Sequence, residues 1–162
     1  MSNKTELEDP ITEAFTLFMQ ASNAVQKYSD STFYKRSRLS TSKYSVLQIL
    51  AMSDGRMTPS EISRWILRER HNVTTLVARM KREGLVEVEP STTDRRSVNI
   101  ILTDKGRQKL EQATPVAQEI LEKVMKSLSE RSVNGFMKSL NILKQNAYDG
   151  MAALAEEKRR NR

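Results

Sequence analysis

The spacing of apolar residues changes at Gly84, and this change constrains the fold more than any other feature of the sequence. From residue 73 to residue 80, apolar residues recur at steps of three and four, which is the spacing of one face of an α-helix. After Gly84, residues 85–89 and 97–100 alternate between apolar and polar, as half-buried strands do. The residues between them, 90–96, are polar, turn-forming and basic. The sequence therefore predicts a helix over about 69–83, followed by a β-hairpin with a basic loop.

A strong helix start signal precedes this helix. The tetrapeptide Thr58-Pro59-Ser60-Glu61 combines a capping residue, a proline at the first helical position and a glutamate that can reach back to the cap. It predicts a short amphipathic helix through Ile66, in which Trp65 is expected to belong to the core. The short helix and the helix at 69–83 are predicted to form a helix-turn-helix, with the hairpin as its wing.

The rest of the chain is predicted to be helical, because only 5 glycines and 4 prolines occur among 162 residues. An apolar face runs from Pro10 to about Tyr28, and residues 29–37 are polar enough either to end that helix or to continue it weakly. A mostly buried helix follows a cap at Ser40 or Thr41. Two more helices are expected, one capped by Thr103 and kinked by Pro115 inside it, the other starting at Ser129.

Composition excludes several classes of protein. The chain has no cysteine and a single histidine, His71, so disulfide frameworks, thiolate metal sites and the usual catalytic triads cannot be assembled. It also has no glycine-rich phosphate loop. We therefore expect no enzymatic activity, no cofactor and no metal. The lack of cysteine favours the cytoplasm, and no apolar run is long enough for a signal peptide or a membrane span, so no membrane association is expected.

The net charge of +7 is concentrated in the middle of the chain. Residues 39–109 contain 13 Lys and Arg against 8 Asp and Glu, a balance of +5. A basic surface favours a polyanionic partner, although charge alone does not separate nucleic acid from a membrane surface, and a solvated helix face is the plainer explanation.

The helix-turn-helix favours nucleic acid. The second helix of such a pair enters the major groove of DNA, and its early residues reach the base edges. Here those residues are donors and acceptors: Arg70, His71, Asn72, Thr74 and Thr75. Arg95 and Arg96, at the predicted tip of the wing, suit a narrow minor groove.

The segments 39–40, 46–47, 58–62, 72–85 and 94–106 resemble the MarR family of winged-helix transcription regulators. The most specific pair of motifs is Gly-Leu-Val at 84–86 together with Asp-Arg-Arg at 94–96 and Leu-Thr-Asp-Lys-Gly at 102–106. The resemblance covers about residues 39–106.

The resemblance implies a mainly α-helical fold with a small β-hairpin wing. A winged helix-turn-helix domain at 39–106 would be flanked by an N-terminal dimerisation helix region, 1–38, and by C-terminal dimerisation helices with a basic tail, 107–162. The homodimer would straddle a palindromic operator in double-stranded DNA.

The resemblance also implies roles for individual residues. Arg96 would enter the minor groove, and Asp94 would pair with Arg96 and Arg79 to hold the wing against the recognition helix. Phosphate contacts would come from Ser40, Thr41, Lys43 and Ser60.

The family often binds a small aromatic or anionic effector between the dimerisation helices and the winged domain. Aromatic and thioether side chains could line such a site here, although core packing explains them equally: Phe15, Phe18, Met19, Phe33, Tyr34 and Tyr44. The function indicated is a sequence-specific repressor released by a ligand. The alternative is a winged-helix protein-interaction scaffold that does not bind DNA.

Overall fold

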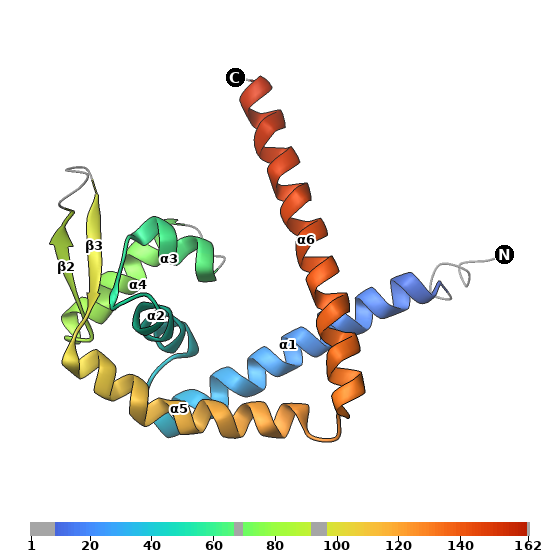
Figure 1. The fold of residues 1–162 in the computed structure, drawn as a ribbon, viewed down its shortest axis with the longest axis horizontal. Helices are drawn as coiled ribbons and strands as arrows, with labels where there is room; N and C mark the ends of the chain where they lie inside the picture. The colour runs from blue at the N-terminus through green and yellow to red at the C-terminus, as the bar shows by residue number, and fades with distance from the viewer. Residues whose placement is uncertain (1–8, 67–69, 92–96, 162) are drawn as a thin grey trace. The chain divides into compact units, whose positions relative to one another are not determined.

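The computed structural model describes residues 9–66, 70–91 and 97–161. The chain divides into two units, residues 1–124 and residues 125–162, which are described separately below. Within the described residues, the first unit holds five helices and a small antiparallel sheet, and the second is essentially one long helix (Figure 1). The predicted fold class, mainly α with a small β-hairpin wing, is confirmed.

The first helix, α1, runs without a break over Pro10–Ser37. Asp9 caps it by accepting a hydrogen bond from the Thr12 amide at 3.1 Å. The polar stretch 29–37 continues this helix because one side of it packs on the core: Phe33 and Ser37 are buried. The Ser37 hydroxyl donates to the Phe33 carbonyl at 2.7 Å and accepts from the Leu39 amide at 3.1 Å.

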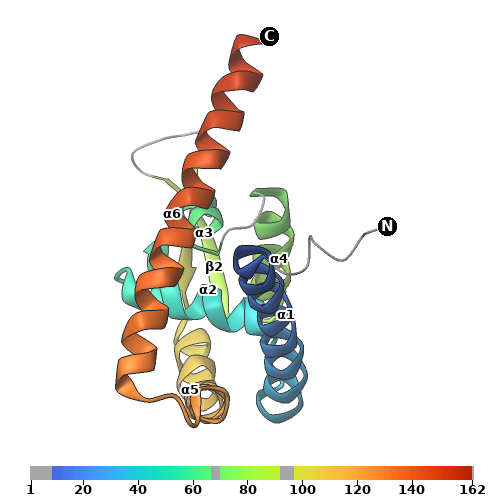
Figure 2. The same cartoon turned by 90° about the vertical axis from the view of Figure 1, so that its right-hand side faces the viewer.

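Helix α2, Thr41–Met52, lies at the centre of the first unit, in contact with α1, with the third helix and with the sheet (Figures 1 and 2). Ser40 is its cap and accepts from the Lys43 amide at 3.3 Å. The helix buries Val46, Leu47, Ile49 and Leu50, four of the residues expected in the core, whereas Met52 at its end is exposed.

The sheet has three strands in the order β1-β3-β2: β1 Arg56–Met57, β2 Val86–Pro90 and β3 Val98–Leu102. The hairpin of β2 and β3 is confirmed, with Val88 opposite Ile100 in the register. Strand β1 was not predicted, because its two residues are too few to show an alternating pattern; Met57 pairs with Ile100.

Helix α3, Pro59–Ile66, begins as predicted. The Thr58 amide donates to the Glu61 carboxylate at 2.7 Å, and the Glu61 amide donates to the Thr58 hydroxyl at 3.3 Å, which completes a capping box. The prediction that Trp65 belongs to the core is wrong, since Trp65 is 61% exposed. The core side of α3 follows Ile62 and Ile66, and Trp65 lies one step around the helix from that line.

Helix α4, Arg70–Arg82, buries Val73, Val77 and Met80 on the predicted stripe. Its C-terminus is closed by Gly84, whose φ is +72°. The Gly84 amide donates to the Lys81 carbonyl at 2.9 Å and the Leu85 amide to the Met80 carbonyl at 3.0 Å. This is the Schellman arrangement, in which a left-handed residue turns the chain out of a helix.

Helix α5, Asp104–Met125, starts in direct contact with the end of α4. The Thr103 hydroxyl accepts from the Gly106 amide at 3.0 Å and donates to the Gly84 carbonyl at 2.7 Å. Gly106 packs so closely that a Cβ atom there would lie 2.1 Å from the Leu85 carbonyl oxygen. The Gly-Leu-Val motif at 84–86 and the Leu-Thr-Asp-Lys-Gly motif at 102–106 therefore pack directly against each other.

The second unit is helix α6, Glu130–Arg160, capped by Ser129, which accepts from the Ser132 amide at 3.1 Å. The helix extends through Lys158, Arg159 and Arg160, so the basic tail is helical almost to its end. Large apolar side chains along α6 are exposed: Phe136, Met137, Ile142, Leu143, Met151 and Leu154.

Candidate nucleic-acid interface

The outer face of α4 carries the side chains that the sequence singled out. All five of its predicted contact residues whose side chains the structure describes are exposed: His71, Asn72, Thr74, Thr75 and Arg79. Arg70 is the first residue of α4. The Thr75 hydroxyl donates to the His71 carbonyl at 3.1 Å, so outward it presents its oxygen lone pairs and its methyl group.

The start of α2 lies beside this face. A surface pocket of about 270 Å³ is lined by residues from both helices: Ser40, Ser42, Asn72, Thr75, Leu76 and Arg79. The first amides of α2 have no partner within their own helix, and such amides attract anions. The fold thus brings Ser40, a predicted phosphate contact, next to Asn72 and Thr75, two predicted base contacts. Ser42 was not predicted to be part of this surface.

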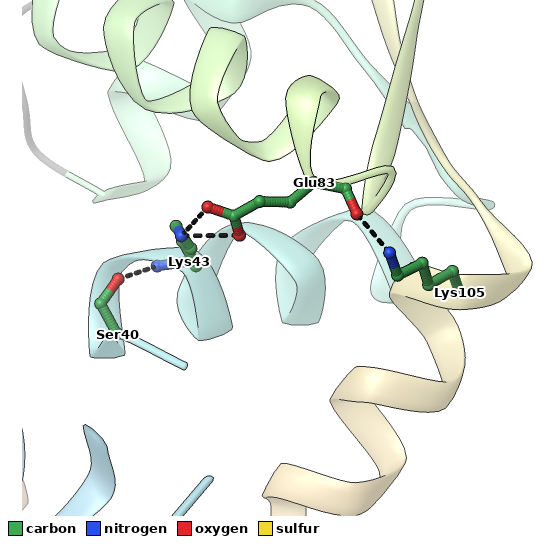
Figure 3. Close-up of polar contacts among 4 residues, drawn as sticks. All are labelled: Ser40, Lys43, Glu83 and Lys105. Atoms are coloured by element: carbon green, nitrogen blue, oxygen red, sulfur yellow. Dashed lines mark hydrogen bonds and ion pairs between the residues drawn. The ribbon is translucent and has the colours of Figure 1, made fainter. Parts of the chain in front are cut away.

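The other predicted phosphate contacts are engaged within the protein or set apart from this pocket. The Thr41 hydroxyl donates to the Asp30 carboxylate of α1. The Lys43 ammonium forms an ion pair with Glu83, a residue that the sequence analysis did not single out (Figure 3). Ser60, in the first turn of α3, is half-buried.

The wing is described only at its base. The Ser91 amide donates to the Ser97 carbonyl at 3.0 Å, and Arg56 of β1 forms an exposed ion pair with Glu89 of β2 at 3.8 Å. Asp94, Arg95 and Arg96 lie outside the described residues, as does the predicted pairing of Asp94 with Arg96 and Arg79.

A second, apolar pocket of about 240 Å³ lies among α1, α2 and α5. Phe33 and Tyr44 line it, with their ring centroids 4.9 Å apart at 63°, an edge-to-face contact. Its wall also includes Val25, Ala117, Ile120 and Leu121. The other four residues predicted to line an effector site are not part of this pocket: Phe15, Phe18, Met19 and Tyr34.

An ion pair links α1 to α5 in the same unit. Arg36 donates both of its terminal nitrogens to the two carboxylate oxygens of Glu119, at 2.6 and 2.9 Å. These hydrogen bonds hold the pKa of Glu119 below its ordinary range. Both side chains are partly exposed, so the pair contributes little to stability and mainly fixes geometry.

Within residues 9–66, 70–91 and 97–161, no group of three or more acidic, histidine or cysteine side chains is arranged to hold a metal ion. In the same part of the chain, no helix has the length and hydropathy needed to cross a membrane.

A helix-turn-helix of α3 and α4 followed by the β2–β3 hairpin defines a winged helix-turn-helix domain. Residues 39–97 match the MarR family. The chain is 31% identical over 112 residues to the transcriptional repressor IacR of Pseudomonas putida, a match that covers 69% of this chain and 66% of that repressor, slightly less than two thirds.

Two solved structures share the fold. The organohalide-sensing regulator RdhR-CbdbA1625 bound to 2,4-dichlorophenol superposes with a TM-score of 0.77 at 23% identity, over 90% of this chain and 86% of that one. The MarR family regulator Sco3205 of Streptomyces coelicolor, in complex with DNA, superposes with a TM-score of 0.79 at 20% identity, over 83% of this chain and 86% of that one. The winged domain of this chain, residues 39–97, is therefore a MarR-type domain.

Proposed function

We propose that the chain is a sequence-specific DNA-binding transcription regulator, a homodimeric repressor on a palindromic operator that a small ligand releases. The observation that carries this proposal is the outer face of α4, which is polar and basic, exposed, and adjacent to the N-terminus of α2. A regulator of this kind is non-catalytic and acts in the cytoplasm.

The residues on this face have different chemical capacities. Asn72 can bond in bidentate fashion to an adenine edge, and Thr75 offers an acceptor and a methyl group to the bases. Arg70, His71 and Thr74 stand on the same early part of α4, and Arg79 follows two turns later. Ser40, Thr41, Lys43 and Ser60 would position the protein on phosphates, which carry no sequence information. In the wing, Arg95 and Arg96 would reach the minor groove and Asp94 would hold Arg96.

The dimer would form through regions 1–38 and 107–162, with the DNA-binding domain at 39–106 between them. The support is exposed apolar surface on α1, at Ile11, Phe15 and Leu17, and along α6. Two copies of α4 should then lie roughly 34–36 Å apart, one turn of the duplex.

The effector would occupy the pocket of Phe33 and Tyr44. Its volume and apolar wall suit one small aromatic ring, and Tyr44, whose hydroxyl lies 3.5 Å from that of Thr114, adds a polar edge. The solved relative that holds 2,4-dichlorophenol suggests phenols as first probes. A ligand here acts only through its different affinities for the DNA-competent and other conformations.

The test begins with selection of a preferred duplex from a random library, followed by anisotropy titrations. Asn72→Ala should cost about 1–3 kcal/mol on the selected duplex and clearly less on random duplex, because it removes a base contact. An equal loss on both duplexes would assign Asn72 to positioning only. A wild-type protein that binds no duplex at low salt would favour the interaction scaffold instead.

A further inference from the structure

Glu83 ends the face of α4 that we assign to DNA. Asn72, Thr75, Arg79 and Glu83 follow one another at steps of three and four residues, so they share one side of the helix. The described turns of α4, Arg70–Arg82, contain no acidic residue. A carboxylate therefore stands at the end of an otherwise polar and basic surface, where a phosphate backbone would repel it.

This carboxylate holds a lysine of the neighbouring helix. The Lys43 ammonium lies 2.5 Å from one carboxylate oxygen of Glu83 and 2.7 Å from the other (Figure 3). The Lys43 side chain is only 19% exposed, whereas that of Glu83 is 46% exposed. Lys43 is the third residue of α2, and its amide donates to the hydroxyl of Ser40, which lines the pocket shared with α4. Its charge is thus neutralised at the place where it would meet a phosphate.

The backbone of Glu83 is fixed independently of its side chain. The Lys105 ammonium donates to the Glu83 carbonyl at 2.7 Å (Figure 3), and the Glu83 amide donates to the Arg79 carbonyl at 3.1 Å. With the α4 terminus held in this way, the carboxylate stays beside Lys43. A DNA phosphate can form an ion pair with Lys43 only if it displaces the Glu83 carboxylate or if the Lys43 ammonium binds both anions at once.

We propose that Glu83 competes with DNA phosphate for Lys43 and thereby limits the affinity of the protein for duplexes of any sequence. The proposal rests on the DNA-binding function proposed above. In this proposal, Lys43 can contact a phosphate only when its ion pair with Glu83 is broken.

The test uses the full chain and a fluorescein-labelled random duplex of about 30 base pairs, long enough for two half-sites. Anisotropy titrations between about 50 and 200 mM salt give the affinity and its salt slope. Glu83→Gln should add one phosphate contact in each subunit of the dimer, which steepens the slope by about 1.8 and raises the affinity about sixtyfold at 0.1 M salt, or about eightfold per subunit. The double variant Lys43→Met with Glu83→Gln should return to the wild-type slope, because the gain acts through Lys43.

Glu87→Gln is the matched control, since it removes one negative charge from an exposed position on β2. Salt at 0.1 M screens charges over about 10 Å. Glu87→Gln should therefore change the affinity for the duplex less than about twofold and leave the salt slope of that affinity unchanged. Glu83→Ala should behave as Glu83→Gln does, which guards against a folding defect in either variant.

An unchanged or weaker affinity in both Glu83 variants would overturn the proposal, as would an equal gain in the double variant or in Glu87→Gln. These outcomes require a wild-type protein that binds the duplex. Failure of the wild type to bind would instead overturn the DNA-binding function.

Discussion

At the scale of single residues, Gly106 has the most restrictive surroundings. It lies in the first turn of α5, where an added Cβ atom would come 2.1 Å from the Leu85 carbonyl oxygen and 2.8 Å from a methyl carbon of Leu102. Backbone atoms cannot yield as a flexible side chain can. The glycine therefore allows the first turn of α5 to pack on the residues that follow the recognition helix.

Substitution of this glycine should destabilise the winged domain. Gly106→Ala is expected to lower the free energy of unfolding by at least about 1–3 kcal/mol, the usual cost of overpacking, as measured by urea denaturation. Gly135→Ala is the control, since Gly135 lies in the second turn of α6 and an added Cβ would have no atom within 4 Å other than its chain neighbours and the nearby backbone of its own helix. It should be neutral or stabilise by about 0.5–1 kcal/mol through helix propensity. Equal effects of the two substitutions would show that the contact at Gly106 is unimportant.

At the scale of helices and strands, the sequence predicts an element well when a local signal and the burial pattern agree. The capping box at Thr58, the stripe from Val73 to Met80 and the glycine at 84 are such cases. Where the sequence left the outcome open or gave no signal, tertiary packing decided. Residues 29–37 continue α1 because Phe33 and Ser37 pack on the core, and β1 forms because it pairs with β3. At the candidate site, exposure of α4 was predictable, whereas the pairing of Lys43 with Glu83, 40 residues apart in sequence, was not.

The start of α3 gives a pH-dependent prediction. The amide and the hydroxyl of Thr58 lower the pKa of Glu61, because both donate to its ionised carboxylate. A lowered pKa in the folded state means that ionised Glu61 stabilises the fold above its ordinary pKa, about 4.3, and that this stability is lost as the pH falls through the lower folded value.

Glu61→Gln keeps an acceptor for the cap but has no charge to titrate. It should be less stable than the wild type by about 0.3–1 kcal/mol at pH 7, and the gap should close as the pH approaches about 3. Urea midpoints measured across this range test the prediction, with Glu111→Gln on α5 as the control for loss of one negative charge. A gap that is constant across the range would contradict it.

At the scale of the whole molecule, the apolar side chains left on the surface account for the proposed dimer. Helix α6 buries none of its residues, yet Phe136, Leu143 and Leu154 recur along it at a spacing suited to a partner helix. A single chain leaves this surface in water at a cost that a second copy would remove.

Charge placed on this surface should separate the two copies. Leu143→Glu should give monomers at micromolar concentration in sedimentation equilibrium, and the affinity for the selected duplex should fall at least about tenfold as the second half-site is lost. Gln145→Glu adds the same charge two residues on, roughly on the opposite side of α6, and should stay dimeric. A dimeric Leu143→Glu variant would place the interface elsewhere.

The contact of Gly84 and Leu85 with Thr103 and Gly106 sets a rule for engineering. A transfer of α4, the helix proposed to read DNA, into another winged-helix protein must carry over the first turn of α5 as well. A crossover point placed between residues 85 and 103 would leave the grafted helix against a foreign surface. Chimeras of this protein should therefore exchange residues 58–106 as one cassette.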